Sequence, residues 1–182
     1  MKRIISILIT ALAFGCSNQN TQQVEATDAV EIPEGGQSNV SDDVSQKNIV
    51  QVAIGSPDHK TLVTALKAAE YVDALSNAGP FTVFAPTDGA FNKLPKGTVE
   101  DLIKPENKDR LRNILEYHVY VGVIRENMMQ DGMNLNQVNS ENVKIGKAGN
   151  NITVNGANVL GSVPTSNGII YVIDQVLLPQ EN

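Results

Sequence analysis

The spacing of apolar residues changes along the chain, from helical in its first half to alternating in its second. Apolar positions between 62 and 75 recur every three or four residues, which predicts one face of a helix that starts near 56–58 and ends near Ser76. Residues 49–54 predict a shorter helix ending at Gly55. Pro105 can begin another, with Leu111, Ile114 and Leu115 on its buried face.

The second half predicts short strands joined by turns. Residues 117–121 alternate with a period of two, and 143–145, 152–154 and 159–160 are short β-prone runs. Asn155–Gly156 is typical of a type I′ hairpin turn, and Asn167–Gly168 predicts a second such turn. It leads into the mostly apolar run 169–178, which predicts a central strand ended by Pro179. Helices followed by strands indicate the α+β class.

Residues 79–91, GPFTVFAPTDGAF, combine a strand, a corner and a helix start. The run 81–84 is too short for a helix and too apolar to lie exposed, so it predicts a buried strand. Pro86 has no N–H for a neighbouring strand, and Thr87 can cap a new helix with Asp88 in its first turn. Thr98 and Asp101 have the spacing of a capping box for a later helix.

The first 47 residues predict export and a tether. Residues 1–15 have a basic start and an apolar run too short to span a bilayer, as in a signal peptide. Cys16, the only cysteine, follows directly, and its position resembles the lipobox of bacterial lipoproteins. We therefore expect lipidation at Cys16; the alternative is a secreted protein with an unpaired cysteine. Residues 16–47 are polar and acidic, which predicts a flexible tether before a folded domain at 48–182.

Charge and composition exclude some classes of function. The chain has 14 Lys and Arg against 20 Asp and Glu, a formal net charge of −6, and no Trp. An acidic chain without a basic patch is unsuited to nucleic acid. The only two histidines, His59 and His118, are not spaced as metal ligands, so no metal and no cofactor are expected.

Three stretches resemble one family, the fasciclin-type domain, in the right order. They are 79–91, the Tyr117–His118 motif, and 166–179, which reads SNGIIYVIDQVLLP. The resemblance implies a β-wedge of about seven strands with packed helices, in which the first and last stretches form neighbouring central strands. It also implies adhesion or surface contacts without catalysis. Gly89 and Tyr171 depart from the usual pattern, which has Glu or Asn and often His at these positions.

The resemblance assigns residues to two kinds of role. Tyr117 and His118 are the candidates for contact with a ligand or partner, although His118 is also typical of a hydrogen-bonded core residue within a strand. The structural signature comprises Phe81, Val83, Phe84, Pro86, Thr87, Asp88, Phe91, Asn167, Gly168, Ile173, Asp174, Leu178 and Pro179.

The sequence leaves three hypotheses for function. The first is an adhesion or binding module, held by its lipid at the outer membrane or cell surface of a Gram-negative bacterium and contacting matrix, polysaccharide or another envelope protein. The second is a periplasm-facing binder of small ligands, with a pocket near Tyr117, His118 and Tyr171. The third, an enzyme, requires a cleft with His118 and an acid in hydrogen-bond reach of one another. Asp88 and Asp174 could act as paired carboxylates only if both faced one cleft. The sequence does not specify an oligomeric state.

Overall fold

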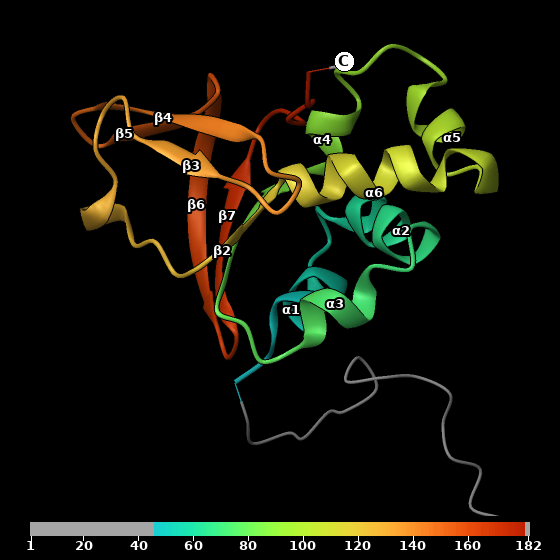
Figure 1. Cartoon of the computed structure of the whole chain (residues 1–182), viewed down its shortest axis with the longest axis horizontal. Helices are drawn as coiled ribbons and strands as arrows, with labels where there is room; N and C mark the ends of the chain where they lie inside the picture. The colour runs from blue at the N-terminus through green and yellow to red at the C-terminus, as the bar shows by residue number, and fades with distance from the viewer. Residues whose placement is uncertain (1–45, 181–182) are drawn as a thin grey trace, which may run out of the picture. The chain divides into compact units, whose positions relative to one another are not determined.

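The computed structural model describes residues 46–180, which form a seven-stranded sheet with helices gathered on one side of it (Figure 1). The helices are α1 (Ile49–Gly55), α2 (Lys60–Ala68), α3 (Val72–Ser76), α4 (Asp88–Phe91), α5 (Thr98–Leu102) and α6 (Lys108–Tyr117), with 3-10 turns η2 (Pro105–Asn107) and η3 (Glu126–Met128). The strands are β1 (Phe81–Pro86), β2 (Val119–Val121), β3 (Asn134–Asn136), β4 (Asn142–Ala148), β5 (Asn151–Val154), β6 (Ala157–Thr165) and β7 (Gly168–Ile173). The predicted α+β class is confirmed.

The strands follow the order β2-β1-β7-β6-β5-β4-β3. The strands β1 and β7 are parallel neighbours, with Phe81 opposite Gly168 and Pro86 opposite Ile173, whereas β2 and β6 flank them in antiparallel orientation. The first and last family stretches therefore form adjacent inner strands, as the resemblance implied.

Alternate residues of β1 and β7 enter two different hydrophobic clusters. Val83 and Ile170 pack with the helices, in a cluster that includes residues of α1, α2, α3 and α6. Phe84, Tyr171 and Ile173 belong to a second cluster, formed with β3, β4 and β5. Both faces of these strands are covered, which explains why their sequences are apolar throughout rather than alternating.

The long helix predicted across residues 62–75 is in fact two helices. The backbone of Glu70 has a φ of 51°, and the N–H groups of Glu70 and Tyr71 donate to the carbonyls of Lys67 and Leu66 at 3.1 and 2.9 Å. This is the Schellman pattern that ends a helix. The apolar spacing continues across the break because α3 packs against the same cluster as α2.

Three turn and cap predictions have different outcomes. Asn155 and Gly156 have φ of 48° and 85°, so the type I′ turn between β5 and β6 is confirmed. The second turn lies one residue earlier than predicted, at 166–167 between the paired residues Thr165 and Gly168, and needs no positive φ. The capping box at Thr98 is wrong, because Thr98 lies inside α5 and makes no capping bond.

Two predicted strands are shorter than expected. The strand β7 ends at Ile173 rather than Leu178; the N–H of Asp174 still donates to the carbonyl of Asn158 in β6 at 3.1 Å, but the residues after it form no strand. The strand predicted at 117–121 begins only at Val119, since Tyr117 ends α6 and His118 is its C-terminal cap.

The predicted signal peptide, Cys16 and most of the tether lie outside the described residues. Within residues 46–180, no helix has the length and apolar character needed to cross a bilayer.

Candidate functional site

The two outer family stretches touch at the start of β1 and β7. The N–H of Phe81 donates to the carbonyl of Asn167 at 3.0 Å. A Cβ on Gly168 would collide with the carbonyl oxygen of Phe81, and one on Gly79 with that of Asn167. Glycine at both positions therefore permits the close approach of the two strands.

The side chain of Asn167 connects this strand start to the helices. Its amide nitrogen donates to the carbonyls of Leu75 and Asn77, both at 2.8 Å, and its amide oxygen accepts from the N–H of Ile49 at 3.0 Å. Because Asn167 is buried, these bonds satisfy backbone groups at the end of α3 and the start of α1 that water cannot reach. The role is structural.

Thr87 and Asp88 form the helix start that the sequence predicted. The hydroxyl of Thr87 accepts from the N–H of Ala90 at 3.2 Å and caps α4. The carboxylate of Asp88 accepts from the N–H of Thr61 at 2.8 Å, so it also satisfies the first turn of α2. Burial alone would raise the pKa of Asp88, but hydrogen bonds from Thr61 and Lys60 outweigh it and hold that pKa below its usual value.

The other acid of the signature, Asp174, holds the end of β7 to β6. Its carboxylate accepts from the backbone and side-chain N–H groups of Asn158 at 2.8 and 3.0 Å. These bonds, with the nearby ammonium of Lys93, lower the pKa of Asp174. The other signature residues of the two stretches lie in β1, β7 or α4 or follow β7, where Leu178 is exposed beside Pro179.

His118 is buried with both ring nitrogens engaged. Its Nδ1 lies 2.8 Å from the carbonyl of Ile114, and its Nε2 accepts from the N–H of Leu177 at 3.0 Å. Only the neutral ring with hydrogen on Nδ1 satisfies both partners. Burial accordingly lowers the pKa of His118 to about 4, and the bond to Ile114 offsets this shift only in part.

Tyr117, the last residue of α6, is buried too, and its side chain packs in the second cluster with residues of β3, β4 and β5. Its hydroxyl donates to the carbonyl of Asn142 at 3.1 Å and accepts from the amide of Asn155 at 2.8 Å, which fixes the β5–β6 turn against α6. Burial raises its pKa. In the described structure neither Tyr117 nor His118 presents a side chain at the surface, so their contact with a partner stays a prediction.

Tyr171 lies apart from this pair. Its ring stacks on Phe84, with centroids 6.0 Å apart, and its hydroxyl donates to the carbonyl of Ile124 at 2.8 Å. Burial raises the pKa of Tyr171 to about 12. The expected pocket shared by Tyr117, His118 and Tyr171 is wrong, because only Tyr171 lies beside the surface groove described next.

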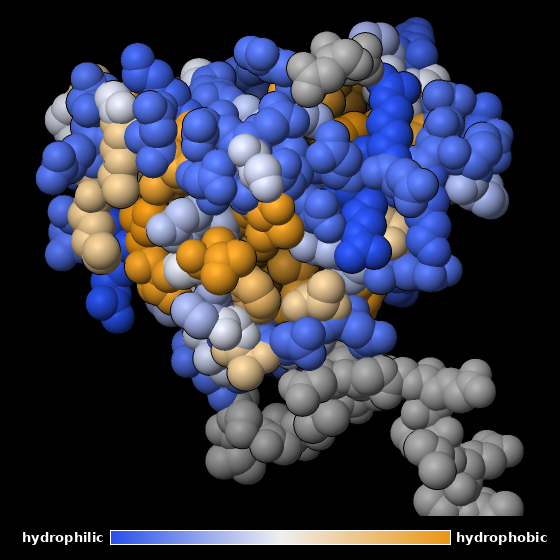
Figure 2. All heavy atoms as spheres, in the orientation of Figure 1, coloured by the Kyte–Doolittle hydropathy of each residue, from blue (hydrophilic) through white to orange (hydrophobic). Residues whose placement is uncertain are grey.

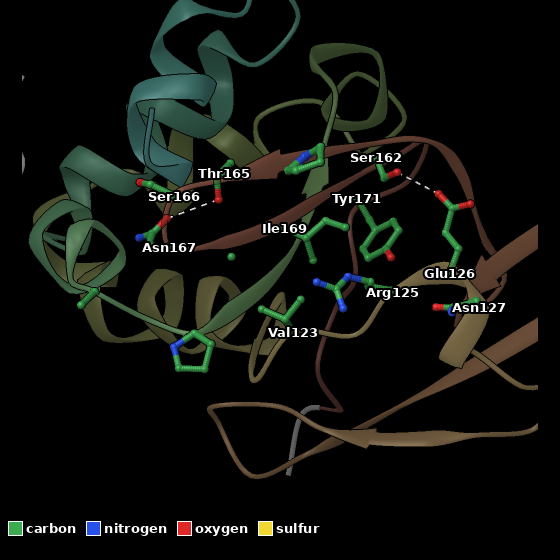
Figure 3. A pocket seen from close by; sticks show the side chains of 14 residues that line it. Val123, Arg125, Glu126, Asn127, Ser162, Thr165, Ser166, Asn167, Ile169 and Tyr171 are labelled. Carbon is green, nitrogen blue, oxygen red and sulfur yellow. Dashed lines mark hydrogen bonds between the residues drawn. The ribbon is translucent and has the colours of Figure 1, made fainter. Parts of the chain in front are cut away.

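A groove of about 700 Å³ opens between the β6–β7 hairpin and the loop that follows β2. Its apolar lining comes from Val123, Ile169 and Pro164, and apolar surface gathers in the middle of the face in Figure 2. At one end the hydroxyl of Ser162 donates to the carboxylate of Glu126 at 2.8 Å (Figure 3). The groove thus combines an apolar floor with a polar rim.

Arg125 extends its guanidinium into this groove, between Val123, Ile169 and Tyr171 (Figure 3). Among residues 46–180 no carboxylate forms an ion pair with it. A guanidinium over apolar side chains offers several fixed donors to a carboxylate or phosphate. The sequence shows no hydrophobic periodicity around Arg125 that would indicate a binding residue. The one indication is that a single basic residue directly follows the apolar run 119–124.

The described residues bring no catalytic set together. His118, Asp88 and Asp174 belong to three separate hydrogen-bond sets, and all three have protein partners. No cluster of three or more potential metal ligands occurs in residues 46–180. Among the methionines, Met129 is buried in the core, Met133 packs against it and Met128 is exposed.

Comparison with known proteins fits this geometry. Residues 57–179 match the fasciclin domain family. The chain is 50% identical over 139 residues to Protein sll1483 of Synechocystis, covering 74% of this chain and 75% of the relative. It is 36% identical over 141 residues to the cell surface glycolipoprotein MPB83 of Mycobacterium bovis, covering 75% and 62%.

A solved structure agrees in fold. The domain pair of the insect cell adhesion molecule fasciclin I superposes with a TM-score of 0.66 at 21% identity, covering 75% of this chain and 52% of that one. The family match, the parallel pair of signature strands and the contacts at Asn167 and Gly168 lead to one conclusion. This chain belongs to the fasciclin domain family.

Proposed function

We propose that this protein is a lipid-anchored binding module of the bacterial envelope, which contacts a protein or polysaccharide through the groove face and carries out no chemistry. The observation that carries the proposal is Arg125, a cation without an ion-pair partner among the described residues, placed over an apolar floor. Such an arrangement is typical of binding sites, where an apolar surface gives contact area and a few polar groups give orientation.

The groove is less suited to catalysis. Its acid, Glu126, is exposed and already accepts a hydrogen bond from Ser162, and the groove has no histidine or lysine as a base for that hydroxyl. A nucleophilic serine needs a base in hydrogen-bond reach and a donor set for the developing oxyanion. We therefore assign the groove to recognition.

The anchor is the second part of the proposal. Cys16 follows a signal-like run, and each buried lipid CH₂ contributes about 0.8 kcal/mol to membrane binding, so several acyl chains would hold the domain permanently. The relative MPB83 carries the name of a cell surface glycolipoprotein, which supports the same placement for this chain. Display at the outer surface is part of this proposal.

Two variants test the two parts separately. Cys16→Ser should move the protein from the membrane fraction to the soluble fraction, with no change in the folded domain. Arg125→Glu should abolish capture of envelope protein or polysaccharide, whereas Lys144→Glu, an equal charge reversal on β4 outside the groove, should not. Equal capture by both charge variants would refute the groove as contact site. Retention of Cys16→Ser in the membrane would refute the anchor.

Binding of a small ligand is the second candidate, favoured by the groove's volume of about 700 Å³, which is within the range of ligand sites. Such a ligand would be an apolar carboxylate held by Arg125. Titration with fatty acids and aromatic acids, followed by NMR shifts of Val123 and Ile169, tests it. Saturable shifts that disappear in Arg125→Glu would favour this candidate.

A further inference from the structure

The chain enters the folded domain at the mouth of the groove. The side-chain amide of Gln46 donates to the carbonyl of Pro164 at 3.3 Å, and the N–H of Ser166 donates to the carbonyl of Lys47 at 3.0 Å. Pro164 and Ser166 both line the groove. Gln46, the first described residue, therefore lies beside the groove.

The residues that precede Gln46 in the sequence carry acidic and apolar side chains that complement the groove. Residues 39–45 read NVSDDVS, in which Asp42 and Asp43 are flanked by Val40 and Val44 and no basic residue occurs. The groove offers the guanidinium of Arg125, which has no ion-pair partner among residues 46–180, over Val123 and Ile169. Acids and valines on one side thus match a cation and an apolar floor on the other.

The segment 39–45 is also long enough to extend into the groove. An extended chain spans about 3.3–3.6 Å per residue, so Asp43 can lie about 10 Å from Gln46 and Val40 about 20 Å. The path along β6 from Pro164 to Ser162, beside Glu126 and Arg125, covers two residues, or about 7 Å. Asp42 and Asp43 can therefore reach the part of the groove formed by Ser162 and Glu126, which line it together with Arg125.

We propose that residues 39–45 of this chain bind in the groove, with the carboxylate of Asp42 or Asp43 on Arg125 and Val40 or Val44 on the apolar floor. The attachment at Gln46 makes the segment a local ligand at an effective concentration on the order of millimolar. The inference rests on the groove's geometry and does not require the proposed function.

Paramagnetic NMR on residues 16–182 with Cys16→Ser tests this directly. A nitroxide label at Ser41→Cys should reduce the methyl signals of Val123 and Ile169 at least twofold, and leave Ile103 on α5 unchanged. Adding Arg125→Gln should restore the two signals, as should Asp42→Asn with Asp43→Asn. A label at Gln22→Cys is the matched control for nonspecific approach of the tether.

Three results would overturn the inference. One is full signal at Val123 and Ile169 with the Ser41 label. Another is an equal reduction in Arg125→Gln, which would show proximity without binding. The third is a reduction that appears when labelled chain is mixed with isotope-enriched unlabelled chain, because the occupant would then be a second copy. If the segment does not bind but Arg125→Glu still abolishes partner capture, the proposed function stands without this intramolecular contact.

Discussion

The ring of His118 accepts a hydrogen bond from the backbone N–H of Leu177, with 3.0 Å between the two nitrogens. This bond joins the C-terminal end of α6 to the segment after β7, 59 residues later in the chain. The family's central histidine therefore anchors the end of the domain. Its other nitrogen is bound to Ile114, so the ring is a structural connector in its neutral form.

This bond predicts a dependence of stability on pH. The pKa of His118 is about 4 in the folded state, against the ordinary histidine value of 6.5 in the unfolded chain, so the unfolded chain binds more protons between these pH values. The stabilisation is complete above pH 6.5 and is lost as pH falls towards 4. The shift corresponds to about 3 kcal/mol of unfolding free energy. Urea denaturation at pH 7 and pH 4 measures it.

The control is His118→Gln, because other groups titrate in the same range. Burial also lowers the pKa of His59, partly offset by Asp58 and Asp88, and acts in the same direction. The variant should be less stable at pH 7 but lose about 3 kcal/mol less on acidification. A His118 imidazole that titrates near pH 6.5 by NMR in the folded protein would contradict the assignment.

Loss of the Asn167 side chain should destabilise the domain strongly. In Asn167→Ala the N–H of Ile49 and the carbonyl of Leu75 lose their partner in a buried region. Each unsatisfied group costs about 1–3 kcal/mol, so we expect a loss of about 3 kcal/mol in unfolding free energy. Thermal and urea unfolding measure it.

Asn167→Asp separates the accepting role of the side-chain oxygen from the donating role of the amide nitrogen. It keeps an oxygen for Ile49 but removes both donors, so it too should be destabilised. Asn150→Ala, at an exposed position, should change the unfolding free energy by less than about 0.5 kcal/mol. A neutral Asn167→Ala would mean that the helices are held to the sheet by apolar packing alone.

The sequence predicts the parts whose causes are local. The structure confirms three such predictions: the cap at Thr87, the turn at Asn155 and Gly156, and the buried strand at Phe81. Each follows from the chemistry of a few neighbouring residues. The break at Glu70 is not predicted, because Val72 and Leu75 keep the apolar spacing after the chain has turned. Spacing reports which residues are buried, not whether the helix is continuous.

The groove escapes prediction for a different reason. Arg125, Ser162 and Ile169 come from three separate segments, and nothing in each segment indicates that they meet. The sequence places His118 in a strand because the apolar–polar alternation of 117–121 extends over the end of a helix. The burial of His118 is predicted correctly. Its hydrogen bond to Leu177 is not, because the two residues are 59 positions apart and only the overall fold brings them together.

Gly168→Ala should be among the most damaging single methyl additions. The new Cβ would meet the carbonyl oxygen of Phe81 and lie 2.8 Å from its carbonyl carbon, which is backbone and cannot rotate away. The strands β1 and β7 would have to separate, so we expect a loss of several kcal/mol or failure to fold.

Gly161→Ala is the matched control for that change. Gly161 lies in β6, with no atom near the position of an added Cβ, so the substitution should be neutral or slightly stabilising. Comparison of soluble yield and unfolding midpoint for the two variants measures the difference. Equal midpoints would show that β1 and β7 can move apart at little cost.

Gly89→Ala should stabilise the protein. Gly89 lies in α4 without a positive φ, and an added Cβ would contact only the hydroxyl of Thr87, at 3.6 Å, an ordinary van der Waals distance. Alanine loses less backbone entropy than glycine on entering a helix, so we expect a gain of about 0.5–1 kcal/mol in unfolding free energy.

The matched control is Gly97→Ala, at the N-terminal cap of α5. Its Cβ would meet open space, but Gly97 has a φ of 87°, which disfavours any side chain, so alanine there should cost about 1 kcal/mol. Urea denaturation of both variants therefore separates backbone conformation from available space. A destabilising Gly89→Ala would instead show that the Thr87 cap requires a small residue beside Asp88. In that case we expect the hydrogen bond from Thr61 to Asp88 to be weakened in the variant.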